Sequence, residues 1–167
     1  MMPRVVLFQP EIPPNTGNVA RSCAATCTEL HLIEPLGFEI SDRTLRRAGL
    51  DYWPWVQLHR HADWRAFQAA RCQRGGRLLA LTRHADQAYH QIRFRPDDWL
   101  LFGRETSGLP EAVLADADTA LAIPMAGSVS NGGGVRSLNL ATAVGVVLFE
   151  ALRQLACSQP EAPEIQR

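Results

Sequence analysis

Short apolar runs alternate with helical patterns along most of the chain, and this alternation constrains the fold more than any other feature. The runs that we expect to be strands cover residues 4–9, 30–33, 55–59, 77–82, 99–103 and 119–123. Strands that alternate with helices are typical of a mostly parallel sheet with helices on both faces. We therefore predict an α/β fold in one domain over residues 1–157. The polar, proline-interrupted residues 158–167 are expected to form a disordered tail.

Helical patterns fill the stretches between these runs, and we predict helices over residues 16–27, 42–48, 63–73, 110–115 and 137–156. Asn15 or Thr16 is the expected N-cap of the first helix and Ser137 that of the last, because such side chains accept hydrogen bonds from free backbone N–H groups. From Leu138 to Phe149 the last helix is apolar or small on nearly every side. A helix without a polar face needs cover on several sides, so we predict a homodimer in which a second copy supplies part of it.

The composition favours a protein that stays in the compartment where it is made. No apolar run approaches the length that spans a bilayer, and the first residues lack the long apolar stretch of a signal peptide. The four cysteines show no metal-ligand spacing. Cys23 and Cys27, one helical turn apart, are interpreted as small buried thiols rather than as a metal or redox pair. We predict a cytoplasmic protein with no membrane segment and no metal.

All seventeen basic residues are arginines. The lack of lysine excludes Schiff-base chemistry and the phosphate-binding loop that depends on a lysine. Residues 1–104 hold fourteen arginines against ten acidic residues, whereas residues 105–167 hold three against seven. A nucleic-acid surface built from the first part is therefore possible, although scattered surface charge gives the same count.

The first segment with chemical potential is EIPPNTGNVAR, residues 11–21. Its prolines make a stiff loop that delivers Asn15 and Gly17 to a helix start, where free backbone N–H groups favour an anionic ligand. Arg21 follows within about one turn of that start and is suited to gripping a phosphate. An ordinary capped helix with a solvated arginine accounts for the same residues.

Two further segments lie where predicted strands end. LLFGRETSGLP, residues 100–110, and the pair IPM (123–125) and RSLNL (136–140) each follow a strand and precede a helix. Ligands of open α/β sheets bind at the carboxyl ends of the strands, so both places suit a binding site. A plain strand–turn–helix connection explains the first of them equally well, and routine helix capping by Ser137 and Asn139 explains the second.

In this order and spacing, the three segments resemble the signature motifs of the SPOUT methyltransferase superfamily. The resemblance covers about residues 4–155, and it extends to the strings IEPLGF, LRRAGLDYW and RSLNLATAVGVVLFEALRQL. The string LRRAGLDY, residues 45–52, favours the branch that methylates the ribose of the wobble nucleotide in tRNA. The chain departs from that pattern between Met125 and Arg136, where a familiar short link is replaced by a longer Gly- and Ser-containing loop.

The resemblance implies a fold and a site that the residues alone do not establish. It implies a C-terminal trefoil knot, a topology that is otherwise almost absent from proteins, and a pocket for the methyl donor S-adenosylmethionine at a dimer interface. By position, the donor contacts are Leu81, Gly103, Ile123, Ser137 and Leu138. Arg21 matches the catalytic arginine. Expected substrate-binding residues are Asn15, Glu105, Asn139, Arg46 and Arg47, the last two facing the anticodon stem-loop of a tRNA, although a solvated helix face fits that arginine pair equally well.

The function predicted from this resemblance is 2′-O-methylation of the ribose at C34 or U34 of tRNA. The sulfonium methyl is already electrophilic, so the protein's task is to align the 2′-oxygen and to stabilise developing negative charge, for which Arg21 is the candidate. Two alternatives stay open. One is a SPOUT methyltransferase that acts on another tRNA position or on rRNA, and the other is a non-catalytic RNA-binding module that kept the fold.

Overall fold

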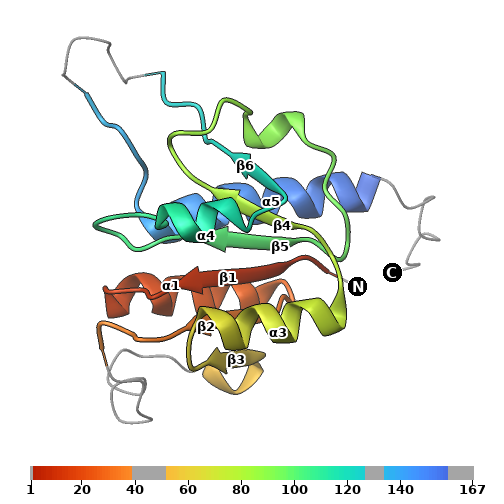
Figure 1. Cartoon of the computed structure of the whole chain (residues 1–167). Coiled ribbons are helices and arrows are strands. Elements are labelled where there is room, and N and C mark those ends of the chain that lie inside the picture. The colour runs from red at the N-terminus through yellow and green to blue at the C-terminus, as the bar shows by residue number, and fades with distance from the viewer. Residues whose placement is uncertain (1, 39–51, 127–133, 158–167) are drawn as a thin grey trace, which may run out of the picture.

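A computed structural model describes residues 2–38, 52–126 and 134–157 of the chain. Six parallel strands form one sheet in the order β3-β2-β1-β5-β4-β6 (Figure 1). The strands are β1 (Arg4–Phe8), β2 (Leu30–Ile33), β3 (Leu58–His61), β4 (Leu78–Leu81), β5 (Trp99–Phe102) and β6 (Thr119–Leu121). The predicted α/β class with a parallel sheet is confirmed.

Helices cover both faces of this sheet (Figure 1). They are α1 (Pro13–Ala25), α3 (Trp64–Arg74), α4 (Glu111–Ala115) and α5 (Leu140–Cys157), with the short 3₁₀ turns η1 (Trp53–Trp55) and η2 (Tyr89–Gln91). Val5 and Leu7 of β1 pack in the core that α1 and α5 close, whereas Val6 and Phe8 face the core that α3 and α4 close. Strands buried on both faces are expected of a parallel sheet, and all five residues of β1 are buried.

The first and last helices begin at other residues than their sequences indicated. Helix α1 starts at Pro13, with proline in its first turn and no side-chain cap. The expectation that Asn15 or Thr16 caps it is therefore wrong, since proline needs no N–H partner at a helix start. Helix α5 starts at Leu140 rather than at 137, and Asn139 caps it instead of Ser137. The Oδ1 atom of Asn139 accepts the backbone N–H of Ala141 at 2.9 Å.

Several smaller expectations also need correction. The stretch predicted as a strand from residue 55 forms η1 first, and β3 begins only at Leu58. Cys23 is buried, which raises the pKa of its thiol to about 12, but Cys27 is exposed. The proposed buried pair is thus half wrong. The predicted helix at 42–48, the tail, and the site candidates Arg46 and Arg47 lie outside the described residues.

Helix α5 is long and apolar enough, by length and composition alone, to cross a membrane. The expectation that no apolar stretch approaches the length needed to span a bilayer is therefore wrong. The packing of α5 is that of a core helix, because Val144, Val147 and Leu148 are fully buried together with strand residues of the sheet. Another side is left uncovered within one chain, since Phe149 is 55% exposed. One side of α5 therefore holds the fold together, while apolar surface remains open on another.

Candidate functional site

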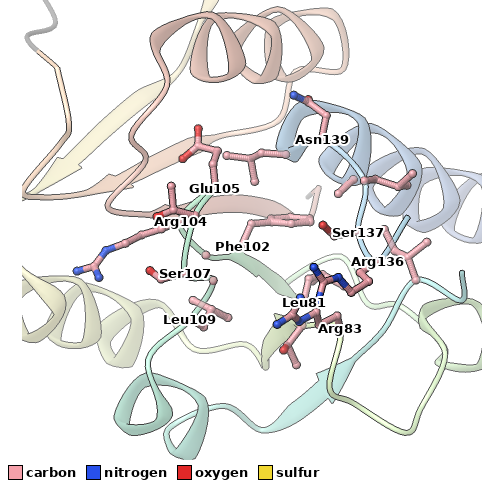
Figure 2. A pocket seen from close by; sticks show the side chains of 18 of the residues that line it. Leu81, Arg83, Phe102, Arg104, Glu105, Ser107, Leu109, Arg136, Ser137 and Asn139 are labelled. Carbon is pink, nitrogen blue, oxygen red and sulfur yellow. The ribbon is translucent and has the colours of Figure 1, made fainter. Parts of the chain in front are cut away.

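A cavity of about 550 Å³ lies at the carboxyl ends of β4, β5 and β6, where open α/β sheets bind ligands. Its walls come from Leu81 and Phe102 at the strand ends, from the loop after β5, and from the segment that precedes α5 (Figure 2). The volume falls in the range of pockets for drug-sized ligands. Apolar walls combined with exposed backbone suit a ligand that has both an aromatic ring and polar groups.

The loop after β5 depends on two glycines. A Cβ atom at Gly103 would lie 2.3 Å from the carbonyl carbon of Gly108 and 2.5 Å from the backbone nitrogen of Leu109. Arg104 and Gly108 exchange two backbone hydrogen bonds of 3.1 and 2.9 Å across the turn. Gly108 adopts a φ of +70°, a conformation that glycine takes without steric cost. The chain therefore folds back on itself here and presents backbone to the cavity.

Glu105 closes this loop onto the start of α1. Its carboxylate accepts the backbone N–H groups of Glu11 at 2.8 Å and of Ile12 at 3.2 Å, and the side-chain amide of Asn15 at 3.2 Å. A carboxylate at a helix N-terminus satisfies free N–H groups and interacts favourably with the helix dipole. The N–H groups of Ile12, the residue just before α1, and of Glu11 are thus bound by a residue more than ninety positions away.

A reciprocal contact strengthens the same junction. The Glu11 carboxylate accepts both the backbone N–H of Thr106 at 3.1 Å and its hydroxyl at 2.7 Å. These bonds from Thr106 hold the pKa of the Glu11 carboxyl below its ordinary value. Since each carboxylate binds the other's segment, the two loops are held in one relative position.

Asn15 and Asn139 join the third segment to the first two. The amide of Asn139 donates to the Oδ1 atom of Asn15 at 2.9 Å, while Asn15 donates to Glu105. A continuous chain of hydrogen bonds therefore runs from the loop after β5, through the start of α1, to the N-cap of α5. The three segments singled out in the sequence meet at one edge of the cavity.

Arg21 does not line this cavity. Because α1 starts at Pro13, Arg21 lies in its third turn rather than within one turn of the helix start. Its guanidinium carbon sits 4.8 Å from the centre of the Tyr52 ring, and the Tyr52 hydroxyl donates to the carbonyl of Gly17 at 2.7 Å. Arg21 is thus an exposed, permanently charged group supported by an aromatic ring.

Most of the predicted site residues come together. The cavity is lined by all five expected donor contacts and three of the expected substrate contacts, namely Leu81, Gly103, Ile123, Ser137, Leu138, Asn15, Glu105 and Asn139. Sequence reasoning missed the lining side chains of Arg83, His84 and Arg136. Arg136 directly precedes the SLNL string, and this position next to a candidate binding segment could have identified it as a lining residue. Figure 2 shows Arg104 with its guanidinium directed away from Ser137 and Arg136.

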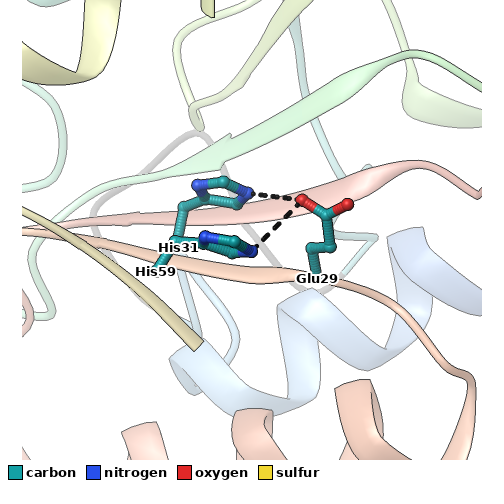
Figure 3. Close-up of side chains that lie close together, drawn as sticks. All are labelled: Glu29, His31 and His59. Atoms are coloured by element: carbon teal, nitrogen blue, oxygen red, sulfur yellow. Dashed lines mark hydrogen bonds and ion pairs between the residues drawn. The ribbon is translucent and has the colours of Figure 1, made fainter. Parts of the chain in front are cut away.

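A second polar cluster lies at the edge formed by β2 and β3, away from this cavity. Among the described residues, Glu29, His31 and His59 have donor atoms close enough to suggest a metal site (Figure 3). Arg74 already binds the Glu29 carboxylate through two bonds of 2.6 and 2.7 Å. The His31 and His59 rings stack at 4.5 Å with an angle of 12°, and their Nε2 atoms lie 3.1 and 3.5 Å from the same Glu29 oxygen that Arg74 binds, so this oxygen already has three partners. The cluster is therefore better suited to joining β2, β3 and α3 than to holding a cation.

Because of this cluster, we expect the free energy of unfolding to depend on pH in the acid range. Burial lowers the pKa of His31 to about 3, and the hydrogen bond from Arg74 lowers the pKa of Glu29 to about 2. The unfolded chain takes up protons on these groups near their ordinary values of 6.5 and 4.5, well before the folded chain does. The free energy of unfolding should therefore fall as the pH drops from about 6.5 toward 3.

Urea unfolding at a series of pH values measures this effect. The variant His31→Leu should flatten the slope between pH 6.5 and 5. The matched control His84→Gln changes an exposed histidine outside the cluster and should leave the slope unchanged. An equal slope in wild type and His31→Leu would show that His31 is not the group responsible.

Comparison with known proteins places these features in a family. Residues 2–149 match the model of the SpoU rRNA Methylase family. The chain is 48% identical to a tRNA (cytidine(34)-2′-O)-methyltransferase of Burkholderia pseudomallei over 90% of this chain and 94% of that protein. It is 46% identical to the protein of that name from Escherichia coli K12, over 92% of this chain and 94% of the relative.

Solved structures of related proteins superimpose on this chain. One, described as "Structural insights into the 2-OH methylation of C/U34 on tRNA", is 52% identical, covers 93% of this chain and 91% of its own, and superimposes with a TM-score of 0.82. Another, the SpoU methyltransferase AviRb of Streptomyces viridochromogenes in complex with the cofactor AdoMet, is 26% identical with a TM-score of 0.77. That match covers 95% of this chain and 62% of AviRb.

Proposed function

This chain belongs to the SpoU rRNA methylase family, and from that premise we propose that it transfers a methyl group from S-adenosylmethionine to the ribose 2′-hydroxyl of the wobble nucleotide, C34 or U34, in tRNA. The observation that carries the proposal is the convergence of the three signature segments on one cavity. Relatives named for this reaction match the chain along nearly its full length.

The cavity fits the donor that the proposal requires. The loop that Gly103 and Gly108 fold back presents its backbone to the cavity, and Leu81, Ile123 and Leu138 offer apolar surface for an adenine ring. The donor supplies an electrophilic methyl group when bound. Support for this choice comes from a family member whose structure contains AdoMet. We further propose that the segment before α5 is threaded as a trefoil knot, because it shares the cavity with the loop after β5.

The protein's own groups then have three tasks. The hydrogen-bonded chain of Glu105, Asn15 and Asn139 fixes the cavity wall relative to α1. Apolar side chains limit the access of water. Arg21 holds the phosphate next to the target ribose and stabilises negative charge on the 2′-oxygen while the hydroxyl proton passes to solvent. Arg21 itself does not act as a base, since a guanidinium keeps its protons in proteins.

Arg21 performs this task across a subunit boundary in our proposal. It is absent from the cavity lining of its own chain, and the exposed apolar side of α5 offers a surface for a second copy. We propose that the protein works as a cytoplasmic homodimer. The guanidinium of one protomer would then complete the site of its partner.

The experiment that tests the function is incubation of the protein with tRNA and S-adenosylmethionine, followed by mapping of alkali-resistant linkages. A 2′-O-methyl group protects the linkage on its 3′ side, so resistance should appear after nucleotide 34 alone. Resistance at another position, or in rRNA, would instead identify the other branch of the family. Tight donor binding without any resistance would favour a non-catalytic module.

The dimer predicts a large effect of Phe149, the exposed aromatic residue of α5. Replacing it with glutamate places a charge on the surface that the second copy should cover, and burying an unpaired charge is costly. Sedimentation should then show a monomer in place of the dimer. The control Arg65→Gln alters an exposed position of α3, on the other face of the sheet, and should leave the dimer intact. A Phe149→Glu protein that stays dimeric would place the interface elsewhere.

Arg46 and Arg47 are proposed to bind phosphates of the anticodon stem-loop. If both do so, replacing both with glutamine should weaken tRNA binding and reduce the slope of log Kd against log salt by about 1.4, at about 0.7 for each single-strand contact. Binding titrations at several salt concentrations measure this slope. The double variant Arg65→Gln/Arg71→Gln, with changes on α3, is the control. A slope that is equal in wild type and variant would refute phosphate contact by the pair.

A further inference from the structure

Trp55 is the most exposed large apolar residue among those that the structure describes, with 69% of its surface accessible. It ends η1, the single 3₁₀ turn between the undescribed stretch 39–51 and β3. An exposed indole offers a flat aromatic face on which a nucleic-acid base can stack. We propose that Trp55 stacks on an unpaired base of the tRNA anticodon loop, next to the nucleotide that is methylated, an inference that rests on the proposed function.

The turn that carries Trp55 is held rigidly. The backbone N–H of Trp55 donates to the carbonyl of Tyr52 at 3.0 Å, and that of Val56 donates to Trp53 at 3.0 Å. Pro54 fixes one backbone torsion between them. Tyr52, Trp53 and Val56 pack against the hydrophobic core, so the turn is anchored while Trp55 faces solvent. A rigid aromatic platform binds a base with little loss of conformational freedom.

The position of the turn points to RNA as the occupant. Tyr52 is fastened to α1 through its hydroxyl and supports the guanidinium of Arg21. The turn η1 also contacts α1, the helix that carries Arg21. The indole and the proposed catalytic guanidinium therefore belong to one surface, in which a cation for phosphate lies near a flat ring.

The chemistry of the substrate matches this pairing. Proteins that recognise single-stranded RNA loops combine arginine contacts to phosphate with aromatic side chains that stack on splayed bases. In an anticodon loop the bases beside nucleotide 34 are unpaired, and presenting the 2′-hydroxyl of nucleotide 34 requires that the loop be held open. An indole that stacks on a neighbouring base would hold it so without reading its identity.

The test is a kinetic comparison of wild type with Trp55→Ala and Trp55→Phe, using tRNA as substrate. Loss of one base–aromatic stack should raise the KM for tRNA about tenfold in Trp55→Ala, with kcat at saturating tRNA and donor affinity close to wild type. Trp55→Phe should recover most of the affinity because it keeps an aromatic face. Trp64→Phe, which changes the half-buried tryptophan that packs against Phe8 on the other face of the sheet, is the matched control and should leave the KM unchanged.

Stem-loops that lack one base identify the stacking partner. Each unpaired position of the anticodon loop, except 34, is made abasic in turn, and binding is measured with both proteins. At one position the loss seen with wild type should be absent with Trp55→Ala, because the two changes remove the same contact. Losses that add at every position would overturn the proposal.

Two further outcomes separate this inference from the proposed function. If Trp55→Ala methylates nucleotide 34 with an unchanged KM, the function stands and the stacking proposal is wrong. If sedimentation shows that Trp55→Ala alters the oligomeric state, the indole is covered by a second copy of the chain, which also overturns it.

Discussion

Replacing Arg21 with alanine is expected to lower the turnover of tRNA by about two to three orders of magnitude, the effect of removing one group that stabilises developing charge. Binding of S-adenosylmethionine should stay close to wild type, because Arg21 does not line the cavity. Stability should change by only about 0.5–1 kcal/mol, the worth of an exposed cation–π contact such as that with Tyr52. Single-turnover kinetics measure the loss of turnover, and calorimetry with the donor measures donor binding separately.

Two controls sharpen this expectation. Arg21→Lys keeps the charge but loses the planar fork of donors, so it should recover only part of the turnover. Arg65→Ala removes an exposed arginine from α3, on the opposite face of the sheet, and should leave the turnover unchanged. Retained turnover in Arg21→Ala would end the assignment of Arg21 as the catalytic group.

A mixing experiment decides whether Arg21 acts within its own chain or across the dimer. Ser137→Trp should fill the cavity from an exposed position that lines it and so produce a second inactive variant. If Arg21 acts across the interface, a mixed dimer of Arg21→Ala and Ser137→Trp contains one complete site and regains part of the activity. If Arg21 acts within its own chain, no mixed dimer is complete, and the mixture stays inactive.

The strands of the sheet could be predicted well because each one is indicated by the residues of its own apolar run. β1 and β5 are continuous apolar runs, and burial on both faces leaves no other place for them. The places where prediction failed are those where distant residues decide. Helix α1 begins at Pro13, and Glu105, far away in the chain, binds the N–H groups of Glu11 and Ile12 that lead into it.

The candidate site shows the same division. The expected donor contacts came from the family resemblance that three short strings carry, and the structure brings those strings to one cavity. Glu105, expected to bind substrate, lines the cavity, and its carboxylate accepts hydrogen bonds from Glu11, Ile12 and Asn15, so we propose that it also positions these residues. No spacing rule could have shown these hydrogen bonds, because their partners lie in the loops after β1 and β5, which are far apart in the sequence and meet only in the folded sheet.

The cavity should be more sensitive to Gly103→Ala than to any other small change in its walls. The added Cβ would lie 2.3 Å from the backbone carbon of Gly108, and backbone cannot move aside as a flexible side chain can. The loop that Arg104 and Gly108 close must therefore open, which also displaces Glu105 from α1. We expect the free energy of unfolding to fall by about 1–3 kcal/mol, as in other overpacked sites.

Donor affinity separates this steric effect from a general loss of stability. A misplacement of about 1 Å in an enzyme site can lower the reaction rate about a hundredfold. We expect a loss of donor affinity of the same order, which calorimetry should show in Gly103→Ala. Gly108→Ala is the matched control in the same loop. A Cβ there meets no atom within 4 Å, although the φ of +70° is unfavourable for alanine and should cost about 1–2 kcal/mol. We expect the two variants to be destabilised to a similar extent, with donor binding retained only in Gly108→Ala. This result would show that the close approach at Gly103 shapes the pocket. Equal donor binding by both variants would contradict a donor site at this loop.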